Sequence, residues 1–348
     1  MPVHPPRLWS LMVLALLAGG LAALEPRWPK VDLALSYVVD PDWPQRPDDL
    51  PWGEMPGIAV DPQDNVYVFT RAEPPVQVYD RQGRFLRAWG KGLVGSAHHL
   101  RIDHEGFVWT TDVDWHIVRK FSPEGQLLLT LGTPQVPGRD GKHFDMPTDV
   151  AIASTGDIFV ADGYGNARIV RFDSKGNYLG EWGQLGSQPG QFSIPHALVR
   201  DSQDRLYVAD RNNARIQVFD TQGRLLDVWA DLVVPWGLYM TKDDQLWVCG
   251  SSPMTWRPED QALGVPPKDQ LFFRFDTQGR LRQLWAVPKG IDGLERPGEL
   301  NWVHCLALDS QGNLYAGDIR GKRAQKFVRV VPPSRQQMPP EASLPRPR

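Results

Sequence analysis

The segment Asp220-Thr-Gln-Gly-Arg224 leads into the strand-like run Leu225–Trp229, and this combination decides the fold because it recurs along the chain. The Gly at the fourth place suits a hairpin turn that needs a positive φ angle. Similar turns, each followed by an apolar run, lie at Asp80–Arg84, Ser122–Gln126, Asp173–Asn177 and Asp276–Arg280. The sequence is therefore an array of short structural repeats, each expected to form four strands.

The last repeat lacks its fourth strand. Counting the first strands gives six copies, but the chain holds only five of the turns described above, and the sixth copy stops after Ala324–Val330. An unpaired strand edge is a liability for a folded protein. The strand-like run Leu33–Val39 precedes the first copy, and we expect it to pair with Ala324–Val330. The prediction is an all-β, six-bladed β-propeller over residues 31–331, closed by an N-terminal strand.

The N-terminal segment suggests an exported protein. Arg7 precedes an apolar stretch from Leu8 to Leu24, so residues 1–24 are predicted to be a signal peptide or an N-terminal membrane anchor. We therefore expect a periplasmic or extracellular location, with possible anchoring through an uncleaved signal. The Pro-rich residues 332–348 are predicted to be a disordered tail. A net charge of −3 predicts no nucleic-acid surface.

Three histidines occupy one register of the repeat, in alternate copies. They are His98, His196 and His304, each two residues before a Leu and five before an Asp. Alternate blades of a six-membered ring lie about 120° apart, so the three imidazoles can converge on the axis. Three imidazoles with an open fourth position are typical of a catalytic zinc site. The alternative is that they are three unrelated loop histidines.

The three remaining positions of this register carry other residues. The intervening copies carry Pro56, Thr148 and Trp236 in the histidine register. His99 follows His98 directly, and strand alternation predicts that its side chain points to the opposite side of the strand. It is therefore the weaker ligand candidate.

Residues that close second strands should meet the histidines at the same mouth of the channel, because the second strand of a blade returns to the face where the first begins. These residues are Arg71, Tyr164 and Arg211. The alternatives are that Tyr164 packs on a blade and that the arginines form ion pairs with strand-end carboxylates such as Asp112 and Asp162. Cys249 and Cys305 could form a disulfide, but two buried thiols are the favoured interpretation.

Several runs closely resemble peptidyl-α-hydroxyglycine α-amidating lyase, a six-bladed propeller of NHL-type repeats. They begin at Met146 (Met-Pro-Thr-Asp-Val-Ala), Asp162 (Asp-Gly-Tyr-Gly-Asn-Ala-Arg-Ile-Val), Pro189 (Pro-Gly-Gln-Phe-Ser-Ile-Pro-His-Ala-Leu) and Ala209 (Ala-Asp-Arg-Asn-Asn-Ala-Arg-Ile-Gln). The resemblance extends over about residues 42–330. It implies a lyase that splits a peptidyl α-hydroxyglycine into a peptide amide and glyoxylate. It also implies a zinc held by three histidines, a catalytic tyrosine and two active-site arginines, which fall on His98, His196, His304, Tyr164, Arg71 and Arg211.

The chain also departs from that family. Cys305 stands where the family has an Asp that binds a structural calcium, so a calcium site is doubtful here. The family's paired cysteines are absent, and Asp145 and Gly165 occupy the places of one pair. Trp302 replaces a Met, and an insertion of residues 251–269 in copy five could cover the mouth.

The expected chemistry is metal-assisted cleavage of a carbinolamide C–N bond in a peptide or small molecule that carries a carboxylate. Tyr164 would take the hydroxyl proton, aided by nearby positive charge, and Arg71 and Arg211 would orient the carboxylate. Two alternatives stay open. One is a lactonase-like propeller hydrolase, which would use calcium held by oxygen ligands. The other is a non-catalytic NHL-type binding propeller.

Overall fold

The structure is a computed structural model that describes residues 36–230, 233–252 and 270–330. The predicted signal or anchor (residues 1–24), the Pro-rich tail (332–348) and nearly all of the copy-five insertion lie outside the described residues. Within the described ranges, no helix is long and apolar enough to cross a membrane.

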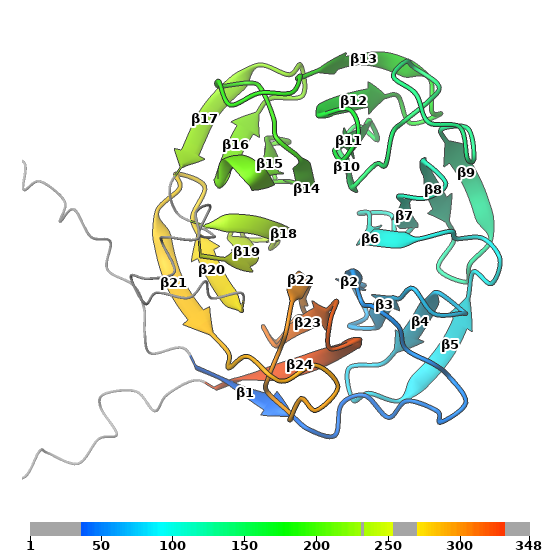
Figure 1. Cartoon of the computed structure of the whole chain (residues 1–348), viewed down its shortest axis with the longest axis vertical. Coiled ribbons are helices and arrows are strands. Elements are labelled where there is room, and N and C mark those ends of the chain that lie inside the picture. Colours follow the sequence, from blue (N-terminus) through cyan, green and yellow to red (C-terminus); the bar gives the residue numbers. More distant parts are fainter. Residues whose placement is uncertain (1–35, 231–232, 253–269, 331–348) are drawn as a thin grey trace, which may run out of the picture.

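The described residues form six four-stranded antiparallel sheets arranged around one axis (Figure 1), which confirms the all-β propeller prediction. Blade 1 contains β2 (Gly57–Val60), β3 (Val66–Phe69), β4 (Val76–Tyr79) and β5 (Phe85–Trp89), and blade 2 contains β6 (Ala97–Ile102), β7 (Val108–Asp112), β8 (Ile117–Phe121) and β9 (Leu127–Leu131). Blade 3 contains β10 (Asp149–Ile152), β11 (Ile158–Asp162), β12 (Arg168–Phe172) and β13 (Tyr178–Trp182), and blade 4 contains β14 (Pro195–Arg200), β15 (Leu206–Asp210), β16 (Arg215–Phe219) and β17 (Leu225–Ala230). Blade 5 contains β18 (Val234–Met240), β19 (Leu246–Ser251), β20 (Leu271–Phe275) and β21 (Leu281–Ala286), and blade 6 contains β22 (Val303–Leu308), β23 (Leu314–Asp318), β24 (Arg323–Val330) and β1 (Ser36–Asp40).

The first strand of the described residues, β1, closes the ring. β1 pairs antiparallel with β24, with Tyr37 opposite Arg329, and Figure 1 shows the two strands side by side. The Tyr37 ring also lies 4.9 Å from Trp285 and 6.1 Å from Trp247 of blade 5, measured between ring centroids. The expected closure by an N-terminal strand is therefore confirmed for residues 36–39, and the beginning of the predicted run lies outside the described residues.

Tryptophans at the ends of outer strands pack adjacent blades together. A Cβ added to Gly125 would meet the Trp89 ring of the preceding blade at 2.5 Å, and one added to Gly223 would meet Trp182 at 2.7 Å. Both glycines also adopt positive φ angles, 93° and 80°. The repeated turn therefore requires Gly for two reasons, namely backbone conformation and close contact with an aromatic ring.

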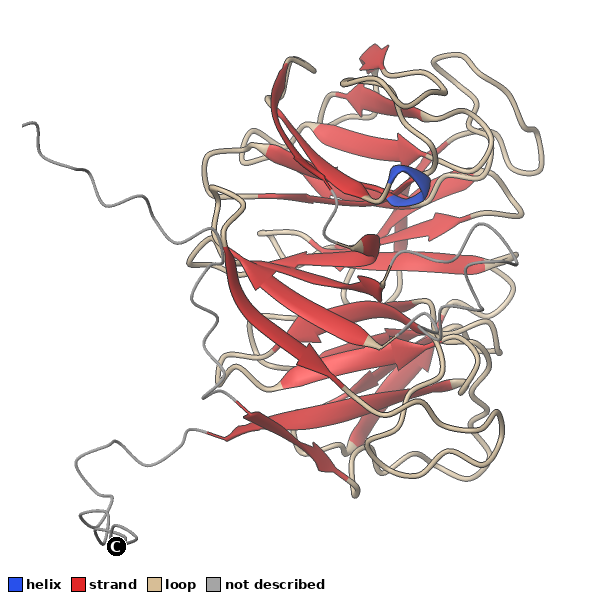
Figure 2. Cartoon of the chain, turned by 60° about the vertical axis from the view of Figure 1, so that its left-hand side comes forward, coloured by secondary structure: helices blue, strands red, loops and turns tan. Residues whose placement is uncertain are grey.

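Figure 2 shows how little helix the fold contains. Within the described residues, the one helical element is the short 3-10 turn η1 (Arg211–Asn213), which follows β15 and carries one of the predicted active-site arginines. The innermost strands of the blades surround the channel. The first residues of these strands therefore supply the side chains that line one mouth of the channel.

Candidate metal centre

A local irregularity turns each of the three register histidines out of its strand pairing. In β14, Pro195 pairs with Asp210 and Ala197 pairs with Ala209, so His196 between them has no partner across the ladder. The same shift occurs at His304, between Val303 and Cys305. A bulged residue leaves the regular alternation and can be redirected. Here the redirection sends the side chain toward the axis.

The three imidazoles converge. The ring centroids of His98, His196 and His304 lie 4.8, 4.9 and 4.9 Å apart, and their potential ligand nitrogens all lie within 4.8 Å of one another. All three side chains are buried. The structure therefore brings the predicted ligands into a cluster that could hold a metal ion.

The intervening blades hold the rings in place through backbone carbonyls. The Nδ1 atoms of His98 and His196 lie 2.6 Å from the carbonyl oxygens of Thr148 and Trp236, respectively. The Nδ1 atom of His304 lies 2.8 Å from the Pro56 carbonyl oxygen. Because a carbonyl can only accept, each Nδ1 carries the proton and each Nε2 keeps a free lone pair. The six positions of the shared register thus alternate between an imidazole and the carbonyl that orients it.

The histidines are held in the neutral form that binds metals. Burial lowers the pKa of His98 and His196 well below the usual range, and mutual repulsion among the imidazoles adds to the effect. Burial also lowers the pKa of His304 to about 4. Neutral imidazoles with free Nε2 atoms fit zinc, and the same donor set also suits iron, copper and nickel.

The Tyr164 hydroxyl lies directly over two of the ligand nitrogens. Its oxygen is 3.1 Å from His98 Nε2 and 3.0 Å from His196 Nε2. Burial raises the pKa of Tyr164, while the positive charges of Arg211 and Arg71 lower it. The Arg211 guanidinium lies 5.7 Å from the centre of the Tyr164 ring. Tyr164 therefore contacts the cluster itself rather than packing on a blade away from it.

Both predicted arginines lie at this mouth, and each contacts a different side chain. Arg71 donates from Nε to the Ala97 carbonyl at 3.1 Å and forms an ion pair with Glu54. Arg211 lies beside Asn212, with its Nε 3.3 Å from the side-chain oxygen. The carboxylates considered as alternative partners, Asp112 and Asp162, bind elsewhere. The structure brings all six predicted site residues together, and their roles as ligands, base and orienting cations stay predictions.

The expected orientation of His99 is wrong. Ala97 pairs with Asp112 and Leu100 pairs with Thr110, so His98 and His99 together oppose Thr111 alone. This wider bulge interrupts the alternation on which the expectation rested. The His99 ring is buried, and its centroid lies 4.9 Å from that of His98 and 5.1 Å from that of His304.

Cys305 and Trp302, two of the departures from the resembled family, lie in β22 and directly before it, on the innermost strand of blade 6. Cys249 and Cys305 are both buried free thiols, as the favoured interpretation predicted. The Cys305 thiol lies 3.7 Å from the Met55 carbonyl oxygen. The Trp302 ring packs against the Trp236 ring at a tilt of 34°, with ring centroids 4.4 Å apart. Trp236 is the residue whose carbonyl orients His196. An aromatic pair therefore borders the mouth between blades 5 and 6.

Comparisons with known proteins agree with this architecture. The NHL repeat profile matches residues 144–172 and 192–219. Human NHL repeat-containing protein 3 is 36% identical over 314 residues, which are 84% of each chain. Peptidyl-glycine α-amidating monooxygenase B from Xenopus laevis is 39% identical over 206 residues, 50% of this chain and 23% of that protein. A probable peptidyl-α-hydroxyglycine α-amidating lyase from Caenorhabditis elegans is 41% identical over 142 residues, covering 40% of this chain and 41% of that protein.

The matched region is thus only part of several relatives, because it spans less than a quarter of the Xenopus monooxygenase and less than half of the worm lyase. Among solved structures, a streptogramin B lyase superposes with a TM-score of 0.55 over 85% of this chain and 97% of that chain. Its 16% sequence identity makes this a similarity of fold alone.

Proposed function

The chain belongs to the family of NHL-repeat propellers that includes the peptidyl-α-hydroxyglycine α-amidating lyases, and we propose that it is itself a metal-dependent carbon–nitrogen lyase. Its substrate would be an α-hydroxyglycine-type carbinolamide, and its products an amide and glyoxylate. One observation carries this proposal above the others. Three buried neutral imidazoles converge at one mouth, and a tyrosine hydroxyl touches two of them.

His98, His196 and His304 would hold the ion, preferably zinc. When bound, zinc supplies Lewis acidity toward a substrate oxygen and additional positive charge beside Tyr164. The carbonyls of Thr148 and Trp236 support this assignment because they fix two ligand rings with Nε2 directed away from the backbone.

Tyr164 would accept the proton of the substrate hydroxyl. The O–H electron pair then forms the new C=O of glyoxylate, the C–N bond breaks, and its electrons leave with the amide nitrogen, which takes up a proton. A free phenol has a pKa near 10, so positive charge is needed for it to act as a base at neutral pH. Arg211 and Arg71 provide part of that charge, since both lower the pKa of Tyr164.

The two arginines would also select for a carboxylate on the substrate. Guanidinium groups bind carboxylates through paired hydrogen bonds. Arg71 donates from Nε to the Ala97 carbonyl, and its Nη1 pairs with Glu54 at the mouth. A substrate carboxylate would compete with Glu54 for the Arg71 guanidinium.

A non-catalytic binding propeller is the second candidate. The human relative that matches 84% of both chains is named only for its repeats. A calcium-dependent lactonase is less well supported, because the converging ligands in the described residues are nitrogen atoms and calcium prefers oxygen. Calcium is also not proposed at Cys305, whose buried thiol replaces a carboxylate.

We further propose that the protein acts after export, in the periplasm or outside the cell, with residues 1–24 as signal or anchor, residues 31–331 as the propeller and residues 332–348 as a disordered tail. Its partner would be a small-molecule or peptide substrate, and no nucleic acid is expected. The predicted signal supports export, and the negative net charge supports the exclusion of nucleic acid.

The test is product formation from N-benzoyl-α-hydroxyglycine, a minimal carbinolamide with a carboxylate. Purified protein should release benzamide and glyoxylate in equal amounts, above the rate without protein. A chelator should abolish the release, and zinc should restore it. His196→Ala should lose both metal and activity, whereas His143→Ala should retain both, because His143 lies away from the cluster beside Asp140. Protein that binds metal at the cluster but releases no glyoxylate would favour the binding propeller.

A further inference from the structure

A fourth imidazole lies on the inner side of the cluster. His99 follows His98 along β6, which runs from the mouth toward Arg101 and Ile102 deeper in the channel. Its ring centroid lies 4.9, 5.1 and 5.8 Å from those of His98, His304 and His196. Tyr164, in contrast, approaches the cluster from the loop that follows β11 at the mouth. The cluster therefore has a tyrosine on its outer side and an imidazole on its inner side.

The His99 ring is held in this position although one of its nitrogens has no partner. Its Nδ1 lies 3.0 Å from His98 Nδ1, and its backbone N–H donates to Thr111 Oγ1 at 2.9 Å. Its Nε2 is buried and has no hydrogen-bond partner among the described residues. Burying a polar nitrogen without a partner costs free energy. The place of the ring against the cluster is therefore set by packing and not by a hydrogen bond of Nε2.

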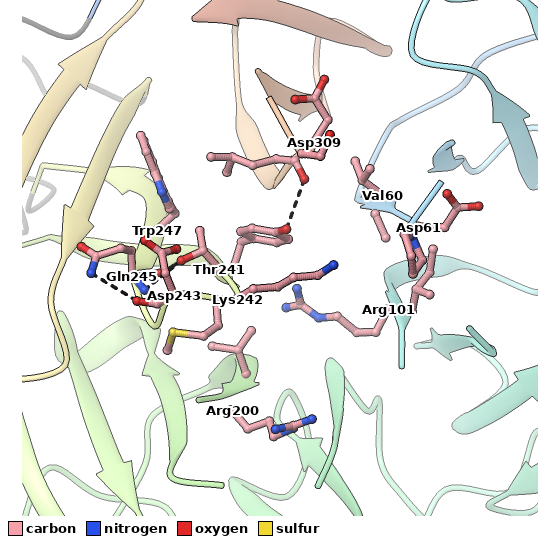
Figure 3. Close-up of a pocket in the computed structure, with 18 of the residues that line it drawn as sticks. Val60, Asp61, Arg101, Arg200, Thr241, Lys242, Asp243, Gln245, Trp247 and Asp309 are labelled. Carbon is pink, nitrogen blue, oxygen red and sulfur yellow. Dashed lines mark hydrogen bonds between the residues drawn. The ribbon is translucent and has the colours of Figure 1, made fainter. Parts of the chain in front are cut away.

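Beneath His99 the channel is crossed by an arginine. Arg101 donates from Nε to Asp149 of blade 3 at 2.9 Å and from Nη1 to the Leu238 carbonyl of blade 5 at 2.8 Å. Figure 3 draws Arg101, Lys242 and Arg200 among the residues that line a separate cavity of about 850 Å³ at the opposite mouth. His99 and Arg101 together thus separate the histidine cluster from this second cavity.

We propose that His99 caps the inner side of the metal centre, so that the exchangeable coordination position of a bound ion opens only toward Tyr164. This inference rests on the proposed metal site and names a positioning residue within it. The nitrogens of His99 do not belong to the group of converging ligand nitrogens. His99 would therefore exclude water by the volume of its ring and not by binding the ion. Substrate and products would then use a single mouth.

The experiment measures the coordination of Co²⁺ in place of the native metal. Four-coordinate Co²⁺ absorbs visible light much more strongly than five- or six-coordinate Co²⁺, so the spectrum reports added water. Full-length protein is stripped with a chelator and loaded with Co²⁺, for the parent, His99→Gly, His99→Ala and His99→Phe. Far-ultraviolet circular dichroism checks that each variant is folded. The Phe variant keeps an aromatic ring of at least the parent's volume and removes both nitrogens.

If His99 is an inner cap, the Gly and Ala variants should lose most of the strong absorption, because water enters on the inner side. The Phe variant should keep the parent spectrum. Parent-like spectra from all three variants would overturn the proposal. Loss of absorption in the Phe variant as well would also overturn it, because the nitrogen and not the volume would then matter. Parent protein that takes up no Co²⁺ would refute this inference and the metal site together. Absence of glyoxylate release with the expected spectra would refute only the lyase.

Discussion

The Arg101–Asp149 pair offers the sharpest test of how the channel is built. The Asp149 side chain is fully buried, and it accepts hydrogen bonds from Arg101, from Leu198 N at 2.7 Å and from Val150 N. Arg101→Met keeps the apolar stem but removes the cation, leaving a buried carboxylate without its counter-charge. Breaking a buried pair in this way costs about 3–5 kcal/mol. We therefore expect the free energy of unfolding to fall by that amount.

The matched control is an exposed pair in the same protein. Arg84 pairs with Asp80 at 2.6 Å, but its side chain is 71% exposed, so Arg84→Met should cost less than about 1 kcal/mol. Both variants are compared with the parent by urea unfolding followed by tryptophan fluorescence. Adding Asp149→Asn to Arg101→Met removes the orphaned charge and should recover part of the loss. An Arg101→Met protein as stable as Arg84→Met would refute the buried-pair reasoning.

Three further outcomes are expected. Tyr164→Phe should lower glyoxylate release by roughly two to four powers of ten while metal content stays unchanged, and a variant with parent activity would place the base elsewhere. Tyr37→Ala should lower the free energy of unfolding by about 1–3 kcal/mol, because packing against blade 5 is lost. The control Val38→Ala should change the free energy of unfolding little, because Val38 is exposed. Equal effects of the two substitutions would contradict closure by β1. In metal-free protein, the free energy of unfolding should fall as pH drops from about 6.5 toward 4. The reason is that the pKa of His304 is about 4 in the folded state, so the unfolded chain binds more protons in this range. A urea midpoint of unfolding that does not change between pH 6.5 and 4 would contradict this prediction.

Local sequence signals determined much of this protein. Each of the five recurring turns has an Asp or a Ser three residues before its Gly, so the repeat, the blade count and the missing sixth outer strand could be found by inspection. The histidine register followed from the same repeat, and it also marked Pro56, Thr148 and Trp236, whose carbonyls orient the rings. The repeat thus marks these three positions, but their orienting role cannot be read from the sequence, because every residue type has a backbone carbonyl.

Tertiary structure alone decided what lies beneath the cluster. The side on which His99 lies depends on a register shift between β6 and β7, and strand alternation predicted the opposite side. The partners of Arg101 lie in blades 3 and 5, and Leu238 is 137 residues away in the chain. Such contacts arise because ring closure brings distant strands to one axis. The physical reason is that the bulge in β6 and the buried Arg101–Asp149 pair depend on contacts between neighbouring blades. The sequence of a single repeat does not contain those contacts.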